Sequence, residues 1–188
     1  VLHDVALQRL PVRFCLDRAG LVGDDGPTHH GAFDLSYLGL IPGVVLMAPR
    51  DTTELQEMMS FMAGYDAGPT VVRYPRGTDE GRVPERRTPI ELGKAEILRK
   101  GTDVAFVAIG SMVGAAWDAA EHLAEKGIHS TVVNARFAKP IDVATIRAVV
   151  ESHPMTFVLE ENALVGGFGQ QVLMAMPEFA GKLRLKGL

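Results

Sequence analysis

The chain has 188 residues, of which 47% are hydrophobic and 22% charged, and its formal net charge is −4 at pH 7. This composition is typical of a folded globular protein and argues against a disordered segment. The longest apolar runs fall far short of the roughly 20 residues that cross a bilayer, so we expect no membrane span. The negative charge excludes a general basic surface for nucleic acid. The lone cysteine, Cys15, excludes a disulfide framework and a cysteine-rich metal site, and suits a reducing compartment.

The first 77 residues alternate between strand-like and helix-like segments, starting at Val1 inside an amphipathic pattern that we interpret as part of a longer protein. A wholly apolar run over 44–48 is typical of a parallel strand buried on both faces. Asp51, with Glu54 three residues later, predicts a capping box before a helix whose methionine stripe we assign to the core. The expected strands cover 11–17, 44–48 and 70–74, and the expected helices cover 33–40 and 51–65.

A charged, proline-containing segment over 78–89 interrupts the alternation and predicts a linker, because it has almost no apolar surface to bury. Beyond it, Ser111 predicts an N-cap and Gly127 a C-terminal stop for the helix between them. The expected strands cover 95–99, 104–109, 130–133, 156–159 and 183–186, with further helices over 142–151 and from near 168. We therefore predict an α/β fold of two mostly parallel-sheet units, over 1–77 and 90–188, the second truncated at its end.

The loop over 17–31 is the outstanding candidate for a functional site. It follows a predicted strand of a parallel sheet, and ligands bind in the loops beyond the carboxyl ends of such strands. Its four glycines allow close approach to a ligand, and it also carries one arginine, three carboxylates and two histidines. The competing interpretation is a solvated turn, since Asp, Gly and Pro are also turn formers.

Two pairs of side chains in and near this loop suggest chemistry. His29 and His30 are adjacent, so on an extended loop they point in opposite directions and only one can face a given site. Their spacing does not predict a metal site. Arg18 and Arg76 each follow a predicted strand of the same sheet, so both can reach one sheet edge and bind a phosphate there. Local pairing of each arginine with a neighbouring acid is the alternative.

Other conspicuous residues receive structural interpretations. The glycines at Gly166, Gly167 and Gly169 lack the spacing of a dinucleotide site and indicate close helix–strand packing. Cys15 lies in a predicted buried strand and is expected to be inert. No role is assigned to the histidines outside the loop, which are His3, His122, His129 and His153.

The residues of the loop are similar to those of a known family. The run over 17–34, together with Tyr-Pro-Arg-Gly at 74–77, resembles the 1-deoxy-D-xylulose-5-phosphate synthases, which are thiamine-diphosphate enzymes of the transketolase group. The segments over 135–142 and 160–167 also resemble that family, so the match covers essentially the whole chain. Transketolases proper share the Asp-Gly-Pro-Thr-His core at 25–29 but not the arginine ahead of it.

The resemblance implies an architecture. Residues 1–77 would be the second half of a thiamine pyrimidine-binding domain, and 90–188 a transketolase C-terminal domain. Thiamine diphosphate and Mg²⁺ would be held mainly by parts upstream of Val1, so no cofactor or metal ligand is assigned within the chain. The resemblance further implies a homodimer in the bacterial cytoplasm, with a plastid enzyme as the alternative.

The resemblance also implies a reaction, in which pyruvate and D-glyceraldehyde 3-phosphate condense to 1-deoxy-D-xylulose 5-phosphate and CO₂. This product is a precursor of isoprenoids, thiamine and pyridoxal. By resemblance, Arg18 and Arg76 would bind the phosphate of the aldehyde and His29 would contact the reacting adduct. Asp25 would order the loop or the hydroxyls of the aldehyde. The 188 residues alone are expected to be inactive.

Two other functions stay open. Another enzyme of the transketolase group, such as a transketolase or the β-subunit of a 2-oxo-acid dehydrogenase, would share the fold. The sequence contexts of Arg18 and Arg76 argue against that assignment. In isolation, the chain could instead be a non-catalytic assembly module that contributes one wall of a site.

Overall fold

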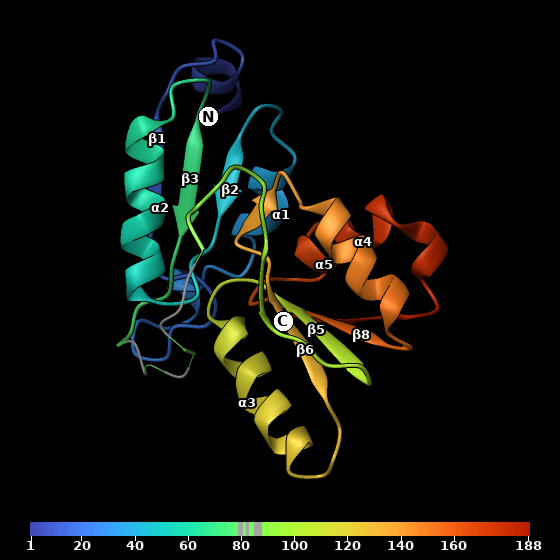
Figure 1. Ribbon diagram of the computed structural model, residues 1–188. Helices are drawn as coiled ribbons and strands as arrows, with labels where there is room; N and C mark the ends of the chain where they lie inside the picture. Colours follow the sequence, from blue (N-terminus) through green and yellow to red (C-terminus); the bar gives the residue numbers. More distant parts are fainter. Residues whose placement is uncertain (79–80, 82, 85–87) are drawn as a thin grey trace.

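The computed structural model describes residues 1–78, 81, 83–84 and 88–188, which form an α/β fold with two sheets (Figure 1). The strand orders are β1-β3-β2-β7 and β4-β6-β5-β8-β9. Among the described strands, β7 pairs antiparallel with β2 and β4 pairs antiparallel with β6, while the other pairs are parallel. The predicted fold class is confirmed. The linker predicted over 78–89 falls partly on 79–80, 82 and 85–87, which lie outside the described residues.

The first sheet is sandwiched between two helices. Its strands are β1 (Arg13–Leu16), β2 (Val45–Met47), β3 (Thr70–Arg73) and β7 (Phe137–Lys139). Helix α2 (Thr52–Gly64) buries Met58 and Met62 against one face, which confirms the core role of the methionine stripe. Helix α1 (Asp34–Gly39) packs on the opposite face, as expected when alternate side chains of a strand point to opposite sides. Short single turns occupy Leu2–Ala6 and Pro27–His29.

The second sheet is also covered on both faces. Its strands are β4 (Glu96–Arg99), β5 (Val104–Ala108), β6 (Ser130–Asn134), β8 (Thr156–Leu159) and β9 (Leu183–Lys186). Helix α3 (Met112–Ala124) lies against one face, and α4 (Val143–Ser152) and α5 (Phe168–Ala175) lie against the other (Figure 1). A turn at Pro177–Phe179 precedes β9.

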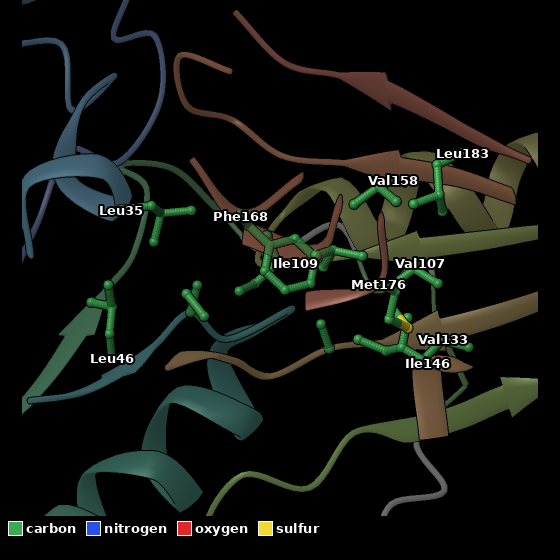
Figure 2. Packing of buried hydrophobic residues seen from close by; sticks show 14 of the residues in the cluster. Leu35, Leu46, Val107, Ile109, Val133, Ile146, Val158, Phe168, Met176 and Leu183 are labelled. Atoms are coloured by element: carbon green, nitrogen blue, oxygen red, sulfur yellow. The ribbon is translucent and has the colours of Figure 1, made fainter. Parts of the chain in front are cut away.

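One hydrophobic core joins the two sheets. One buried cluster contains residues from both halves of the chain. It includes Leu35 of α1 and Leu46 of β2, and also Ile109 and Phe168 from the second half. Figure 2 shows the ring of Phe168 between the leucines on one side and Ile109 on the other. Because this core is continuous, the faces of the sheets that carry it are fixed relative to each other.

Strand β7 was not predicted from the sequence. Phe137 and Lys139 belong to the second half of the chain, yet they pair with Met47 and Leu46 in the first sheet. The ammonium of Lys139 donates hydrogen bonds to the carbonyls of Gly39 and Ile41, at 2.8 and 2.7 Å, where α1 ends. The second half of the chain therefore completes the sheet of the first.

Three local expectations meet different outcomes. Asp51 does cap α2, because its carboxylate accepts a hydrogen bond from the amide of Glu54 at 2.8 Å. The reciprocal half of the box differs, since the carboxylate of Glu54 accepts from the amide of Arg50. Ser111 occupies the N-cap position of α3, as predicted, but its side chain makes no capping hydrogen bond. Cys15 is exposed, not buried, because β1 lies at the edge of its sheet.

Candidate functional site

The carboxyl ends of β1 and β3 meet at one edge of the first sheet. Leu16 lies opposite Arg73 in parallel register, and the pairing continues beyond the strands. The amide of Tyr74 donates to the carbonyl of Leu16 at 2.9 Å, and the amide of Ala19 donates to the carbonyl of Tyr74 at 3.0 Å. Arg18 and Arg76, the two arginines named from the sequence, therefore both follow the carboxyl ends of adjacent strands and lie at the same end of the sheet.

Asp25 joins these two arginines. One oxygen of its carboxylate accepts from Nε of Arg18 at 2.8 Å, and the other pairs with Nη1 of Arg76. Arg18 also pairs with Asp17 through Nη1. Among the described residues, no hydrogen bond engages Nη2 of either arginine. The structure thus brings three of the predicted site residues together and leaves guanidinium donors available for an anion.

The arginines keep Asp25 ionised. Hydrogen bonds from Arg76 and then Arg18 lower the pKa of its carboxyl below the ordinary value of 3.8. The same contact raises the pKa of the Arg76 guanidinium. Asp25 is therefore an acceptor at neutral pH and has no proton to donate. Its role in this arrangement is to hold two positively charged groups side by side.

The backbone around Arg18 adopts a conformation that side chains other than glycine rarely take. Its φ is +61°, in the left-handed region, and its carbonyl accepts from the amide of Gly31 at 2.9 Å. A Cβ atom on Gly31 would lie 2.4 Å from that carbonyl oxygen, so only glycine fits there. Gly20, with φ +76°, also exchanges backbone hydrogen bonds with Gly31. The two ends of the loop are thereby closed on each other.

The two histidines of the loop differ in their surroundings, as expected from their adjacency. His29 is exposed at the end of the turn Pro27–His29, and its Nδ1 lies 3.0 Å from the hydroxyl of Thr28. Within the described part of the chain, Nε2 of His29 makes no hydrogen bond. Nδ1 of His30 accepts from the amide of Val22 at 3.0 Å. His30 therefore holds the loop, whereas His29 presents a ring nitrogen to solvent.

The segment after β8 supports the loop from the other half of the chain. The side chain of Asn162, which is fully buried, accepts from the amide of Leu35 at 3.1 Å and donates to the hydroxyl of Ser36 at 2.9 Å. The amide of Ala163 donates to the carbonyl of Ala32 at 2.7 Å. Sequence reasoning missed these contacts, because they join residues that are distant along the chain. They tie the start of α1, just after the loop, to the second sheet.

Glu160 follows β8, and its buried carboxylate lies at the start of α5. Its carboxylate accepts from the amides of Phe168 and Gly169, each at 2.8 Å. A Cβ atom on Gly167 would lie 2.3 Å from this carboxylate, and one on Gly169 would lie 3.3 Å from Leu185 of β9, so the predicted close helix–strand packing is confirmed at Gly169. Burial raises the pKa of Glu160 to about 7, although the two amides and Arg73 favour its charged form.

We expect Glu160 to make stability depend on pH. The pKa of Glu160 is raised on folding from 4.5 to about 7, so the folded state is favoured when Glu160 is protonated. The contribution of Glu160 to the free energy of unfolding is therefore complete below pH 4.5 and is lost as the pH rises through 7. Glu160→Gln mimics the protonated acid. Relative to this variant, the parent should lose about 3 kcal/mol of unfolding free energy between pH 5 and pH 8. Urea unfolding of both proteins measures the difference, with exposed Glu151→Gln as the control. A difference that stays constant with pH would contradict the assignment.

A buried ionic network lies where α2, β4 and β6 meet. Arg136, with φ +59°, donates from Nε to Glu54 at 2.9 Å and from Nη2 to Glu96 at 2.8 Å. Asn134 donates to Glu54 at 2.9 Å. Further donors of Arg136 bind the hydroxyl and carbonyl of Thr88. The network therefore joins both halves of the chain to the end of the segment that connects them.

The described residues include no group of three or more His, Cys, Asp and Glu side chains that could hold a metal ion. Among the described helices, none combines the length and apolar character needed to cross a bilayer.

Comparison with known proteins places both halves of the chain. Residues 1–79 match the family model of the transketolase pyrimidine-binding domain, and residues 93–186 match that of the transketolase C-terminal domain. A solved structure described as a split-gene transketolase, inactive beta4 tetramer, matches with a TM-score of 0.87 and 26% identity. The match covers 100% of this chain and 60% of that chain.

Several similar curated proteins share one name. The 1-deoxy-D-xylulose-5-phosphate synthase of Gloeobacter violaceus is 53% identical over 178 residues, and that of Synechocystis sp. is 51% identical over 179 residues. Each match covers 94% of this chain but 28% of the relative, so the chain spans little more than a quarter of their length. By its two matched domains, the chain belongs to the transketolase family.

Proposed function

We propose that this chain forms the aldehyde-binding part of a 1-deoxy-D-xylulose-5-phosphate synthase. The observation that carries the proposal is the pair Arg18 and Arg76, held side by side by Asp25 at one sheet edge. Paired guanidiniums bind phosphate through charge-assisted hydrogen bonds. The phosphate of D-glyceraldehyde 3-phosphate fits this chemistry, and pyruvate is the second substrate. The identity to curated synthases supports the same substrates.

The residues of this chain would bind and orient the substrates. Arg18 and Arg76 hold the phosphate, Asp25 holds the arginines, and Nε2 of His29 donates a hydrogen bond to an oxygen that gains negative charge. When bound, thiamine diphosphate supplies the electron sink that the loss of CO₂ from pyruvate requires. The donors described here suit phosphate and carboxylate oxygens of substrates. We assign neither the cofactor nor Mg²⁺ to named residues of this chain.

The proposal extends to the setting of the enzyme. We place the protein in the bacterial cytoplasm, supported by relatives from bacteria, and its product in the synthesis of isoprenoids, thiamine and pyridoxal. We also divide the chain into a pyrimidine-binding part over 1–77, a linker over 78–89 and a C-terminal domain over 90–188. The two family matches, over 1–79 and 93–186, support this division.

A chimeric enzyme tests the function. In it, this chain replaces the matching 178 residues of the Gloeobacter violaceus synthase. With thiamine diphosphate, Mg²⁺, pyruvate and D-glyceraldehyde 3-phosphate, this chimeric synthase should release CO₂ and form 1-deoxy-D-xylulose 5-phosphate. Ketose donors in place of pyruvate separate this activity from that of a transketolase. A chimeric synthase that folds and binds thiamine diphosphate but forms no product would contradict the proposal.

A second candidate function is a non-catalytic assembly module. The observation that favours it is the solved relative whose description reads inactive beta4 tetramer. Under this alternative the chimeric synthase would fold and bind thiamine diphosphate but stay inactive.

Arg76→Ala in the chimeric synthase tests the phosphate role. Removing one charge-assisted contact should raise the KM for D-glyceraldehyde 3-phosphate by roughly 10–150-fold. The KM for pyruvate should not change, because pyruvate carries no phosphate. Initial rates over a range of each substrate give both constants, and Arg147→Ala, on the surface of α4, is the control. An unchanged KM for the phosphorylated aldehyde would remove Arg76 from the site.

We also propose that the complete protein is a homodimer with α1 at its interface. Phe33, Tyr37 and Leu40 form an exposed apolar stripe along this helix, and Val165 and Met174 are exposed on the adjoining segment and α5. The hydroxyl of Ser36 donates to the carbonyl of Val165, which joins the two parts of the surface. Apolar surfaces of this kind mark interaction sites.

Charge placed on this stripe should break the dimer. Leu40, which is 79% exposed, is replaced by aspartate in the chimeric synthase, and the mass is measured by light scattering. We expect Leu40→Asp to give monomers at concentrations where the parent is dimeric. Ile128→Asp, on the turn after α3, should leave the mass unchanged. A dimer that persists in Leu40→Asp would place the interface elsewhere.

A further inference from the structure

Arg73, the last residue of β3, is a buried arginine that substrate chemistry does not explain. Its exposed fraction is 2%, so it cannot contact a substrate held at the surface of the loop. Burying a guanidinium is costly unless its donors are satisfied. The position of Arg73 is nevertheless central, because it lies three residues before Arg76 on the same backbone segment.

The guanidinium of Arg73 binds backbone atoms from two other segments. Nη2 donates to the carbonyl of Gly31 at 2.9 Å and to the carbonyl of Glu161 at 3.0 Å. Nε lies 3.6 Å from a carboxylate oxygen of Asp34, which supplies the opposite charge. Arg73 thus connects the strand that leads to Arg76, the end of the candidate loop, and the segment after β8.

The contact with Gly31 leads directly to the other arginine of the site. The amide of Gly31 donates to the carbonyl of Arg18 at 2.9 Å, and the space around Gly31 has no room for a Cβ atom. Arg18 holds a left-handed backbone, with φ +61°, so its orientation depends on these hydrogen bonds. A displacement of the Gly31 peptide would therefore move Arg18 relative to Arg76.

We propose that Arg73 is a positioning residue of the phosphate site, which sets the spacing of Arg18 and Arg76 through Gly31 and anchors both to the second half of the chain through Glu161. The inference rests on the proposed function, since it takes the two arginines as the phosphate ligands. One guanidinium can bind a phosphate through two parallel hydrogen bonds, and two guanidiniums can bind the same phosphate only if they are correctly spaced. A small misplacement of binding groups can cost up to about 100-fold in rate.

The test compares Arg73→Lys and Arg73→Met in the chimeric synthase with two aldehydes. Lysine keeps the charge beside Asp34 but cannot reproduce the planar donor pattern of arginine. We expect the KM for D-glyceraldehyde 3-phosphate to rise by about 10- to 100-fold in Arg73→Met and less in Arg73→Lys. The KM for pyruvate, and the kcat/KM for unphosphorylated D-glyceraldehyde, should stay close to the parent values.

A double-mutant cycle separates positioning from general damage. If Arg73 sets the spacing of the two arginines, Arg73→Met should have a much smaller effect once Arg76 is alanine than it has in the parent. Arg13→Lys is the matched control, because Arg13 also donates to backbone carbonyls but lies at the opposite end of the same sheet. Thermal unfolding shows which variants fold, and Arg73→Lys decides the question if Arg73→Met does not fold.

The outcomes distinguish this inference from the proposed function. A parent chimeric synthase without activity would overturn the proposed function. An active parent in which Arg73 variants lose kcat/KM equally for both aldehydes would overturn the positioning role. The same holds if the effects of Arg73 and Arg76 add, or if Arg73→Lys matches the parent with every substrate.

Discussion

Replacing Arg136 by methionine should lower the free energy of unfolding by about 3–5 kcal/mol. Arg136 is 1% exposed and forms ion pairs with Glu54 at 2.9 Å and Glu96 at 2.8 Å, both of which are also buried. Methionine fills similar volume but removes the cation that Glu54 and Glu96 share, and among the described residues Glu96 keeps only the ion pair with Arg50, at 3.6 Å. A loss of this size is a large fraction of the stability of many domains, so the variant should unfold at a much lower urea concentration than the parent.

Urea unfolding of the chain measures this effect against two controls. Arg147→Met removes an exposed arginine that pairs with Glu178, and it should cost only a small fraction of the loss at Arg136. Arg136→Lys should recover part of the loss, because it restores the charge but not the branched donor pattern. If Arg136→Met and Arg147→Met unfold at the same urea concentration, the buried network contributes nothing specific.

His29→Ala should reduce the kcat of the chimeric synthase by about 10²- to 10³-fold with little change in the KM for either substrate. Removing one hydrogen-bond donor to a developing oxyanion has effects of this size. The imidazole is exposed in the same loop that carries Arg18 and Asp25, and its Nδ1 lies 3.0 Å from the hydroxyl of Thr28. The expected loss lies in turnover, because the charge that His29 stabilises is greatest in the transition state.

Two further variants sharpen this test. His29→Gln retains a donor near the same place and should keep more activity than His29→Ala. His122→Ala removes an exposed histidine on α3 and should behave like the parent. Turnover by His29→Ala at the parental rate would show that His29 takes no part in the chemistry.

Most of the fold could be predicted from the sequence, because most helices and strands are marked by patterns of residues that are close together in the chain. Apolar runs such as 104–109 and caps such as Asp51 report on residues near them in the chain, and the structure confirms the elements that they predicted. Strand β7 has three residues and pairs with β2, far away in sequence, so no local pattern marks it. Ser111 shows the same limit, since a capping residue type does not ensure a capping hydrogen bond.

The candidate site could be predicted only in part. Arg18 and Arg76 could be placed at one edge because each follows a parallel strand. The role of Asp25 in joining the two arginines could not be predicted, because the course of a glycine-rich loop is set by contacts such as that between Gly31 and Arg18. Arg73 was missed because its sequence neighbourhood resembles any strand end, and its importance comes from partners in two distant segments.

The position of β7 means that the boundaries of the matched domains and the boundaries of the sheets do not coincide. The segment matched over 93–186 carries the edge strand of its neighbour's sheet, and the segment matched over 1–79 lacks it. Expressed alone, the segment over 93–186 would present β7 without its partner strand. The segment over 1–79, expressed alone, would present β2 as an open edge. Open edges recruit other chains. Produced together, the two segments should instead find each other and rebuild one sheet, as the halves of a complementing pair of protein fragments do.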